Sequence, residues 1–197
     1  FQFAKLAFEK ALITSGLTYS IVRPTAFFKS LSGQIPRLRK GKAFLVFGNG
    51  ELTACKPISD DDLGNFMVDC IADPAKHNKI LPIGGPGPAI TPRDQARALF
   101  SLLGRPIKLR RVPVALLRII SGALRLAGVL IPAAQRKADL AEIGLYYATE
   151  SMLVWNGPEQ GYSEENTTST GTEHLFDHYA KVMRSGADVP RGDHSVF

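Results

Sequence analysis

The residues FQFAKLAFEKALITSGLTYSIVRP, positions 1–24, decide the fold class. Apolar side chains recur there at helical spacing with alanines beside them, which predicts a helix that ends at Gly16. β-Branched and aromatic residues follow from Thr18 to Val22 and predict a strand, which Arg23 and Pro24 end. A helix followed at once by a strand is half of a βαβ unit, so we expect an α/β protein with a parallel sheet.

Lys5 lies on the apolar stripe of this first helix, together with Phe1, Phe8 and Leu12. A lysine at such a position ordinarily packs its stem on the core and extends its ammonium to water. A functional ammonium is the other explanation, because ligands of open α/β sheets bind beyond the carboxyl ends of the strands. Residues 23–29 are therefore expected to line a ligand crevice.

The rest of the chain continues the alternation of helices and strands. Two β-rich runs, 43–47 and 52–58, flank Gly48-Asn49-Gly50-Glu51 and predict a hairpin. Ser59 and Thr91 are each expected to cap a helix, and Thr172-Glu173 is expected to cap the last one. Further strands are expected over 79–83, 107–112 and 151–155, and further helices over 32–39, 113–132 and 135–147.

Composition narrows the class of partner. The chain has 197 residues and a formal net charge of +6, which favours an anionic partner. No nucleic-acid-binding motif accompanies the charge, so we expect no nucleic-acid partner. The two cysteines, Cys55 and Cys70, form no CxxC pattern, so neither a disulfide framework nor a zinc site is expected.

The most apolar stretch, 112–132, is interrupted by Arg118 and Arg125 and falls short of a membrane span. Two explanations stay open for it. It is either an amphipathic helix that packs on the domain or a helix that faces a membrane surface or a pigment.

Several patterns carry no site. A dinucleotide fingerprint around Gly48 and Gly50 would need a glycine where Thr53 stands. His174 and His178 lie four residues apart on a predicted helix, but no third ligand is close, so no metal site is expected. The acidic run at positions 60–62 is expected to be the favourable charge of a helix N-terminus.

The Phe1-x-x-x-Lys5 spacing, the glycine-broken turn and the Arg23-Pro24 strand end together resemble the short-chain dehydrogenase/reductase superfamily, in its atypical, NmrA-like branch. There the motif is Tyr-x-x-x-Lys, and the lysine hydrogen-bonds the nicotinamide ribose. The resemblance implies NADPH as cofactor and Lys5 as the catalytic lysine. Phe1 stands where the tyrosine would be, so the usual proton donor is missing. The residues implied to lie beside the cofactor are Lys5, Arg23, Pro24, Thr25 and Phe27.

Longer strings narrow the resemblance: LTYSIVRPTAFFKSLSGQ (17–34), LPIGGPGPAITPRDQ (81–95), YYATESMLV (146–154) and GDHSVF (192–197). Together they resemble the divinyl chlorophyllide a 8-vinyl-reductase family, and only its C-terminal part, so we expect a fragment. That family reduces the 8-vinyl group of divinyl chlorophyllide or protochlorophyllide to ethyl in chlorophyll and bacteriochlorophyll biosynthesis. The alternatives are an NmrA-like NAD(P)-binding regulator without catalysis, or another atypical reductase of the same superfamily.

The resemblance also implies an architecture and a substrate site. Residues 1–83 would be the C-terminal part of a doubly wound Rossmann-type domain with an inserted hairpin, and residues 84–197 the substrate-side helices and tail. A magnesium tetrapyrrole needs an apolar pocket with one or two cations. The expected substrate residues are Phe28, Lys29, Lys56 and Tyr147, with no metal ligand. We favour a bacterial source, hence the cytoplasm with peripheral contact to the photosynthetic membrane; a plant or algal source implies the plastid.

Overall fold

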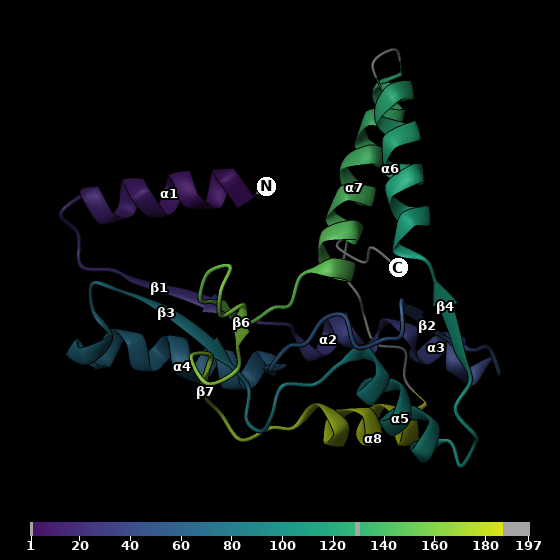
Figure 1. The fold of residues 1–197 in the computed structure, drawn as a ribbon. Helices are drawn as coiled ribbons and strands as arrows, with labels where there is room; N and C mark the ends of the chain where they lie inside the picture. The colour runs from purple at the N-terminus through teal and green to yellow at the C-terminus, as the bar shows by residue number, and fades with distance from the viewer. Residues whose placement is uncertain (1, 129–130, 187–197) are drawn as a thin grey trace.

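The computed structural model describes residues 2–128 and 131–186, in which helices surround short parallel sheets (Figure 1). The N-terminal part contains α1 (Gln2–Thr14), β1 (Ser20–Pro24), α2 (Phe28–Leu31), the 3-10 turn Ser32–Gln34, α3 (Ile35–Arg39) and β2 (Phe44–Phe47). The middle contains α4 (Asp60–Ala72), the 3-10 turn Pro74–Lys76, β3 (Lys79–Gly84), α5 (Pro92–Leu102) and β4 (Leu109–Val112). The remainder contains α6 (Val114–Gly128), α7 (Pro132–Thr149), β5 (Val154–Trp155), β6 (Tyr162–Ser163), β7 (Thr168–Ser169) and α8 (Leu175–Ser185).

The main sheet is parallel, in the order β1-β3-β7. β1 pairs with β3 along its whole length, from Ser20 opposite Lys79 to Pro24 opposite Ile83. β7 then adds two residues at the carboxyl end of β3. The prediction of an α/β protein with a parallel sheet is therefore confirmed.

The predicted hairpin around Asn49-Gly50 is wrong. β2 pairs in parallel with β4, more than 60 residues further along the chain, and not with 52–58. The other edge of β2 is occupied by the Gln34 amide, which donates to the Leu45 carbonyl at 2.9 Å and accepts from the Leu45 N–H at 2.7 Å. With β4 on one side and Gln34 on the other, no edge of β2 is left for a hairpin partner.

The buried core lies where α5 and α8 meet α2, α3 and β2, so it crosses the boundary drawn from the sequence at residues 83 and 84. Tyr179 of α8 is at its centre and fully buried. Its hydroxyl hydrogen-bonds the Leu31 carbonyl at 3.0 Å and Gln95 Oε1 at 3.2 Å, which satisfies the polar group inside an apolar cluster. The cluster comprises Phe28, Ile35, Leu38, Phe44, Val46, Ala96, Leu99, Phe100, Leu175 and Tyr179.

Local capping signals predicted two helix starts correctly. Ser59 accepts from the Asp62 N–H at the start of α4, and Thr91 forms a reciprocal capping box with Asp94 at the start of α5. The third start is wrong, because α8 begins at Leu175 with His174 as its N-cap and no side-chain cap. Its expected capping residues, Thr172 and Glu173, instead donate their backbone N–H groups to Asp62.

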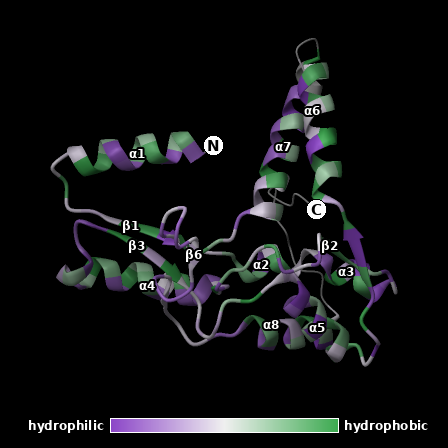
Figure 2. Ribbon diagram, viewed as in Figure 1, coloured by the Kyte–Doolittle hydropathy of each residue, from purple (hydrophilic) through white to green (hydrophobic). Residues whose placement is uncertain are grey.

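Two helical elements extend away from the sheets, and both contain hydrophobic residues along their length (Figure 2). No described residue of α1 is buried, and Phe8 is 70% exposed, so the stripe that predicted this helix contacts no core within the described chain. The second element is the antiparallel pair of α6 and α7, which projects away from the rest of the chain (Figure 1). Ser121, Ala138 and Ala148, small side chains on the facing sides of these helices, are buried, which is typical of closely packed helices.

Candidate site at the carboxyl edge of the parallel sheet

Three chain segments meet where β1 and β3 end. The Thr25 N–H donates to the Ile83 carbonyl at 3.0 Å, and the Ile58 N–H donates to the Ala26 carbonyl at 2.9 Å. Phe27 forms an isolated parallel bridge with Ile58. Residues 24–28, 56–58 and 83–85 therefore form one hydrogen-bonded edge, at the place where open α/β sheets bind their ligands.

Two adjacent glycines make this close approach possible. A Cβ atom on Gly84 would overlap the Cβ of Lys56, and one on Gly85 would overlap the Pro57 carbonyl oxygen. The Gly85 N–H donates to the Lys56 carbonyl at 3.0 Å. Any larger residue would push residues 56–57 away from the end of β3.

Lys56, one of the predicted substrate residues, lies in a covered position. Only 6% of it is exposed, and its ammonium donates to the Thr167 carbonyl at 3.1 Å. The Lys56 carbonyl in turn accepts from the Thr25 hydroxyl. Because the ammonium is covered and used in this contact, Lys56 joins two chain segments, and its contact with a substrate carboxylate stays a prediction.

Arg23 and Glu9 connect the first helix to the sheet. Arg23, on β1, donates from Nε to Glu9 Oε1 at 3.1 Å, and its Nη2 atom forms an ion pair with Glu9 Oε2. The hydrogen bond from Arg23 lowers the pKa of Glu9, and the charge of Lys5 adds to the shift. Lys5, one turn before Glu9, is exposed on the helix that this ion pair links to the strand.

The two phenylalanines after Pro24 have different surroundings. Phe28 is buried in the core cluster, and its ring centroid lies 5.4 Å from that of His178. Phe28 also lines the pocket between α2, the start of α4 and α8, and its assignment as a substrate contact stays a prediction. Phe27 is partly exposed at the sheet edge, and Lys29 is exposed beyond it.

Tyr147 lies at the base of α7, in a group of aromatic side chains. Its ring centroid is 5.7 Å from that of Tyr146, in an edge-to-face arrangement. The Tyr162 hydroxyl hydrogen-bonds the Glu150 carboxylate just beyond this helix. Burial and the Glu150 carboxylate raise the pKa of Tyr162, and Tyr146 contributes, so these residues are electrostatic neighbours.

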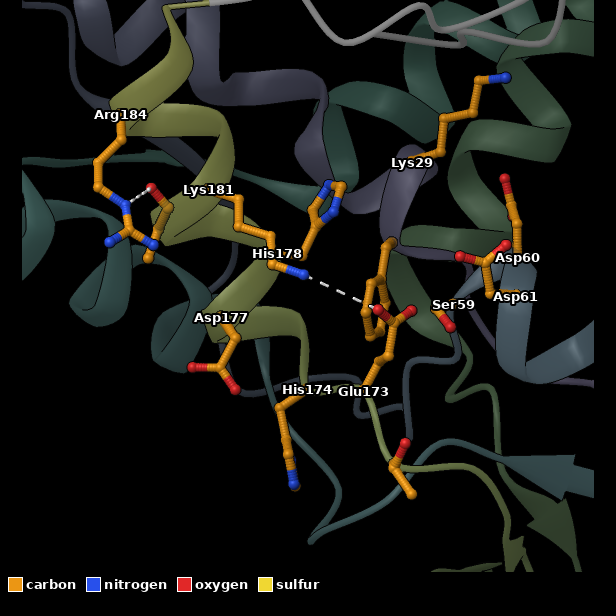
Figure 3. Close-up of a pocket in the computed structure, with 13 residues that line it drawn as sticks. Lys29, Ser59, Asp60, Asp61, Glu173, His174, Asp177, His178, Lys181 and Arg184 are labelled. Atoms are coloured by element: carbon orange, nitrogen blue, oxygen red, sulfur yellow. Dashed lines mark hydrogen bonds and ion pairs between the residues drawn. The ribbon is translucent and has the colours of Figure 1, made fainter.

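A pocket of about 770 Å³ lies between α2, the start of α4 and α8 (Figure 3). It mixes cationic and anionic side chains, with Lys29 on one wall and Asp60 and Asp61 at the α4 N-terminus. His178 lines it too, yet its Nε2 atom is covered and has no hydrogen-bond partner among the described residues. Burial lowers the pKa of His178 and favours the neutral ring. The ring of His178 packs against those of Phe28 and Tyr179, between the pocket and the core.

Two kinds of site are not found within residues 2–128 and 131–186. No three histidine, cysteine, aspartate or glutamate side chains are grouped so that they would hold a metal ion. None of the helices in those ranges is long and apolar enough to cross a bilayer.

Sequence reasoning missed the residues that hold the edge together. Thr167 is buried in a polar, turn-rich stretch, and Trp155 and Tyr162 pair across two strands of only two residues each. A strand of two residues is too short to show the alternating pattern from which strands are predicted. The run Ala-Cys-Lys-Pro-Ile-Ser at 54–59 contained the one available signal, since a lysine within an apolar run before proline is poorly explained by an open loop.

Comparison of sequences relates the chain to plant enzymes. The chloroplastic divinyl chlorophyllide a 8-vinyl-reductase of Arabidopsis thaliana is 48% identical over 94% of this chain and 46% of its own length. The Zea mays enzyme of the same name is 46% identical over 100% of this chain and 51% of its own length. The chain thus spans about half the length of the curated relatives it matches. No family model matches the chain.

Comparison of structures relates the fold to reductases solved with NADPH. The complex of the Escherichia coli quinone oxidoreductase QOR2 with NADPH superposes with a TM-score of 0.57 at 18% identity, over 90% of this chain and 58% of that one. The leucoanthocyanidin reductase–NADPH complex from Vitis vinifera gives 0.58 at 13% identity, over 91% of this chain and 59% of that one. The fold is that of NADPH-binding reductases of the Rossmann type, and in sequence the chain is similar over its whole length to the divinyl chlorophyllide a 8-vinyl-reductases.

Proposed function

We propose that the protein reduces the 8-vinyl group of divinyl chlorophyllide or divinyl protochlorophyllide to ethyl with NADPH, as a step of chlorophyll or bacteriochlorophyll biosynthesis. The observation that carries this proposal is the identity of 45–48% to four plant enzymes of that name, spread over 94–100% of this chain. The hydrogen-bonded edge at the ends of β1 and β3 supports it, because it has the topology at which such folds bind a dinucleotide.

The residues present fit the nicotinamide end of NADPH. Lys5 lies on the helix that Arg23 and Glu9 link to β1, and Gly84-Gly85 lets residues 56–57 close onto the end of β3. We assign Lys5 to the ribose hydroxyls, and Pro24, Thr25 and Phe27 to the nicotinamide side of the edge. In this assignment Arg23 acts by orienting α1 through Glu9, and its guanidinium remains beside the cofactor.

NADPH, when bound, supplies the hydride. The vinyl group is conjugated with the macrocycle, so negative charge left after hydride arrival spreads over the ring. A strong acid is therefore less necessary than in carbonyl reduction, and Phe1 in the place of a tyrosine is compatible with the reaction. The chain itself contributes four groups. Lys5 positions the cofactor and Phe27 excludes water. Lys29 offers a cation to the substrate, and Tyr147 offers an aromatic ring.

Replacing Lys5 by Met tests this assignment. The variant keeps the apolar stem and removes the hydrogen-bond donors. Because a hydrogen bond to a charged group contributes about 1.5–3 kcal/mol, turnover should fall at least about tenfold and NADPH should bind more weakly. The shift of the Soret band on reduction of a divinyl pigment measures the first, and fluorescence titration with NADPH the second.

Lys10→Met is the matched control, because Lys10, like Lys5, is an exposed lysine on the same helix but lies outside the Phe1-x-x-x-Lys5 spacing. It should change turnover and affinity by less than about twofold, as a solvated lysine would. Equal behaviour of the two variants would remove Lys5 from the site. A protein that binds NADPH and never shifts the Soret band would instead be a cofactor-sensing regulator of the NmrA-like kind.

We also propose a peripheral contact between the α6–α7 pair and a photosynthetic membrane. Leu116, Ile119, Ile120 and Leu126 follow one another along one face of α6 and are all exposed, Leu126 by 77%. Arg118 and Arg125 lie on the other side of the helix, and Arg136 and Lys137 at the start of α7 add positive charge. An apolar face with nearby cations is the composition that binds anionic lipid surfaces.

Flotation with anionic and with neutral vesicles tests this contact. Leu126→Glu should abolish flotation with the anionic vesicles. Val68→Glu, the same change at an exposed position of α4, should not. Equal flotation of the two variants would remove the contact. Since the matched plant enzymes are named chloroplastic, we place the protein in the plastid if its source is a plant or an alga, and in the cytoplasm if it is a bacterium.

A further inference from the structure

We propose that Trp155 and Tyr162 present an aromatic face on which the flat macrocycle of the substrate stacks. This inference rests on the proposed function and names residues that would recognise the substrate. Neither residue belongs to the motifs by which the chain resembles a reductase, and both lie on the short antiparallel pair of β5 and β6.

The two rings are held together and one of them is open to solvent. Trp155 lies directly opposite Tyr162 in the strand register, and the ring centroids are 4.8 Å apart with the ring planes at 60°. This edge-to-face arrangement occupies at most one face of each ring. Trp155 is 54% exposed, so much of its ring surface is accessible to a further molecule.

The aromatic face is rigid before any ligand arrives. The Tyr162 hydroxyl is fixed by the Glu150 carboxylate, which also helps to raise the pKa of Tyr162, so the ring carries a neutral hydroxyl. The loop between the strands is closed by the Asn156 N–H, which donates to the Gly161 carbonyl at 2.9 Å. A preorganised aromatic surface loses little conformational freedom on binding, which favours affinity.

A chain of hydrogen bonds connects this face to the proposed cofactor edge. The Thr25 hydroxyl donates to the Lys56 carbonyl, and the Lys56 ammonium donates to the Thr167 carbonyl at 3.1 Å. The Thr167 hydroxyl then accepts from the Val154 N–H at 2.9 Å. Trp155 follows Val154, so its backbone position is fixed relative to Thr25 through the buried Lys56.

In Figure 1 β6 is drawn near the carboxyl end of β1, and the Tyr162–Glu150 hydrogen bond ties β6 to the segment that follows α7. Tyr146 contributes to the pKa shift of Tyr162 and packs edge-to-face against Tyr147. A conjugated macrocycle presents a broad apolar face, and aromatic rings stack on such a face with little dependence on its peripheral groups. The macrocycle could thus stack on the aromatic face while its vinyl group points to the edge where the hydride would arrive.

Tryptophan fluorescence gives a test that does not depend on turnover. Trp155 is the single tryptophan of this chain, and a tetrapyrrole stacked on it would quench its emission by energy transfer. We would titrate the intact protein, saturated with NADP⁺, with divinyl chlorophyllide, and subtract the signal of Trp155→Phe. Quenching of the Trp155 signal that saturates with pigment is the expected result.

Affinities of the variants complete the test. Trp155→Ala should weaken pigment binding about tenfold and raise KM by a similar factor, with kcat and NADPH affinity nearly unchanged, since a stacking face acts on binding. Trp155→Phe should recover most of the affinity, and Tyr162→Phe keeps the ring and should lose less than Trp155→Ala. Phe176→Ala, which removes an exposed ring on α8, is the control and should bind pigment as the parent does.

The outcomes separate this inference from the proposed function. Unquenched Trp155 in a protein that reduces the vinyl group, or a Trp155→Ala variant with parental pigment affinity, would overturn the aromatic face. Saturable quenching together with weaker pigment binding by Trp155→Ala, in a protein that never reduces the pigment, would keep the face and remove the reductase activity. A Trp155→Ala variant whose melting temperature falls is replaced by Trp155→Leu, which fills the site without a ring and should bind pigment as weakly.

Discussion

Asp62 joins two distant parts of the chain, and its removal should destabilise the fold more than the loss of any other acidic residue at the start of α4. Its side chain is 7% exposed, and its Oδ2 atom accepts from the Thr172 N–H at 3.1 Å and from the Glu173 N–H at 2.9 Å. A hydrogen bond to a charged group contributes about 1.5–3 kcal/mol. Because both donors are only partly buried and regain some contact with water, we expect Asp62→Ala to lower the free energy of unfolding by about 2–4 kcal/mol.

Urea-induced unfolding followed by circular dichroism measures this loss in the intact protein. Asp61→Ala is the matched control, because Asp61 is exposed on the same turn and contributes mainly its charge at the helix N-terminus, about 0.3–1 kcal/mol. Asp62→Asn keeps an oxygen acceptor and should lose roughly half as much as Asp62→Ala. If Asp62→Ala and Asp61→Ala unfold at the same urea concentration, the two backbone hydrogen bonds contribute nothing and the reasoning fails.

Three further predictions concern Gly171, His178 and Glu9. Gly171→Ala should destabilise by more than about 1 kcal/mol and show no additivity with Asp62→Ala in unfolding experiments, because φ is +79° and a Cβ would overlap the Asp62 carboxylate. Burial lowers the pKa of His178 below its usual value of about 6.5. As the pH drops below that value, the unfolded chain takes up a proton before the folded protein does, so the free energy of unfolding falls. His178→Phe should therefore make the urea midpoint of unfolding less dependent on pH between about pH 7 and pH 5. The hydrogen bond from Arg23 lowers the pKa of Glu9 below its usual value of about 4.3. The pair therefore stabilises the folded protein above that pH, and this stabilisation is lost on acidification. Glu9→Gln should make the urea midpoint of unfolding less dependent on pH between about pH 5 and pH 3.

Signals that act within a few residues predicted the elements well. The Ser59 and Thr91 caps were correct, because a hydroxyl three residues from an N–H needs only local geometry. The hairpin at Asn49-Gly50 was wrong for the complementary reason. The turn signal is local, whereas the partner of β2 is decided by β4 and by the Gln34 amide, and neither is visible in the sequence around the turn.

The same contrast between local signals and long-range contacts applies to the predicted site residues. Residues 23–29 were placed at the carboxyl end of a strand by the helix–strand alternation, and the resemblance singled out Pro24, Thr25 and Phe27 among them; the structure puts these three residues at that end of β1. The burial of Lys56 was not predictable, because its acceptor, the Thr167 carbonyl, lies 111 residues further along the chain. A buried ammonium without such an acceptor would be strongly unfavourable, so its position depends entirely on a contact that no local pattern encodes.

In the proposed reaction Lys56 has a positional role. Its ammonium is buried and bonded to a backbone carbonyl, so it is not exposed to a carboxylate in solvent. The segment that it fixes at Thr167 carries Val154 and hence the exposed Trp155. We propose that charge selection falls to exposed cations such as Lys29, and recognition of the ring plane to the aromatic face. Two separate recognition elements of this kind suit a substrate that is apolar over most of its surface and charged at one point.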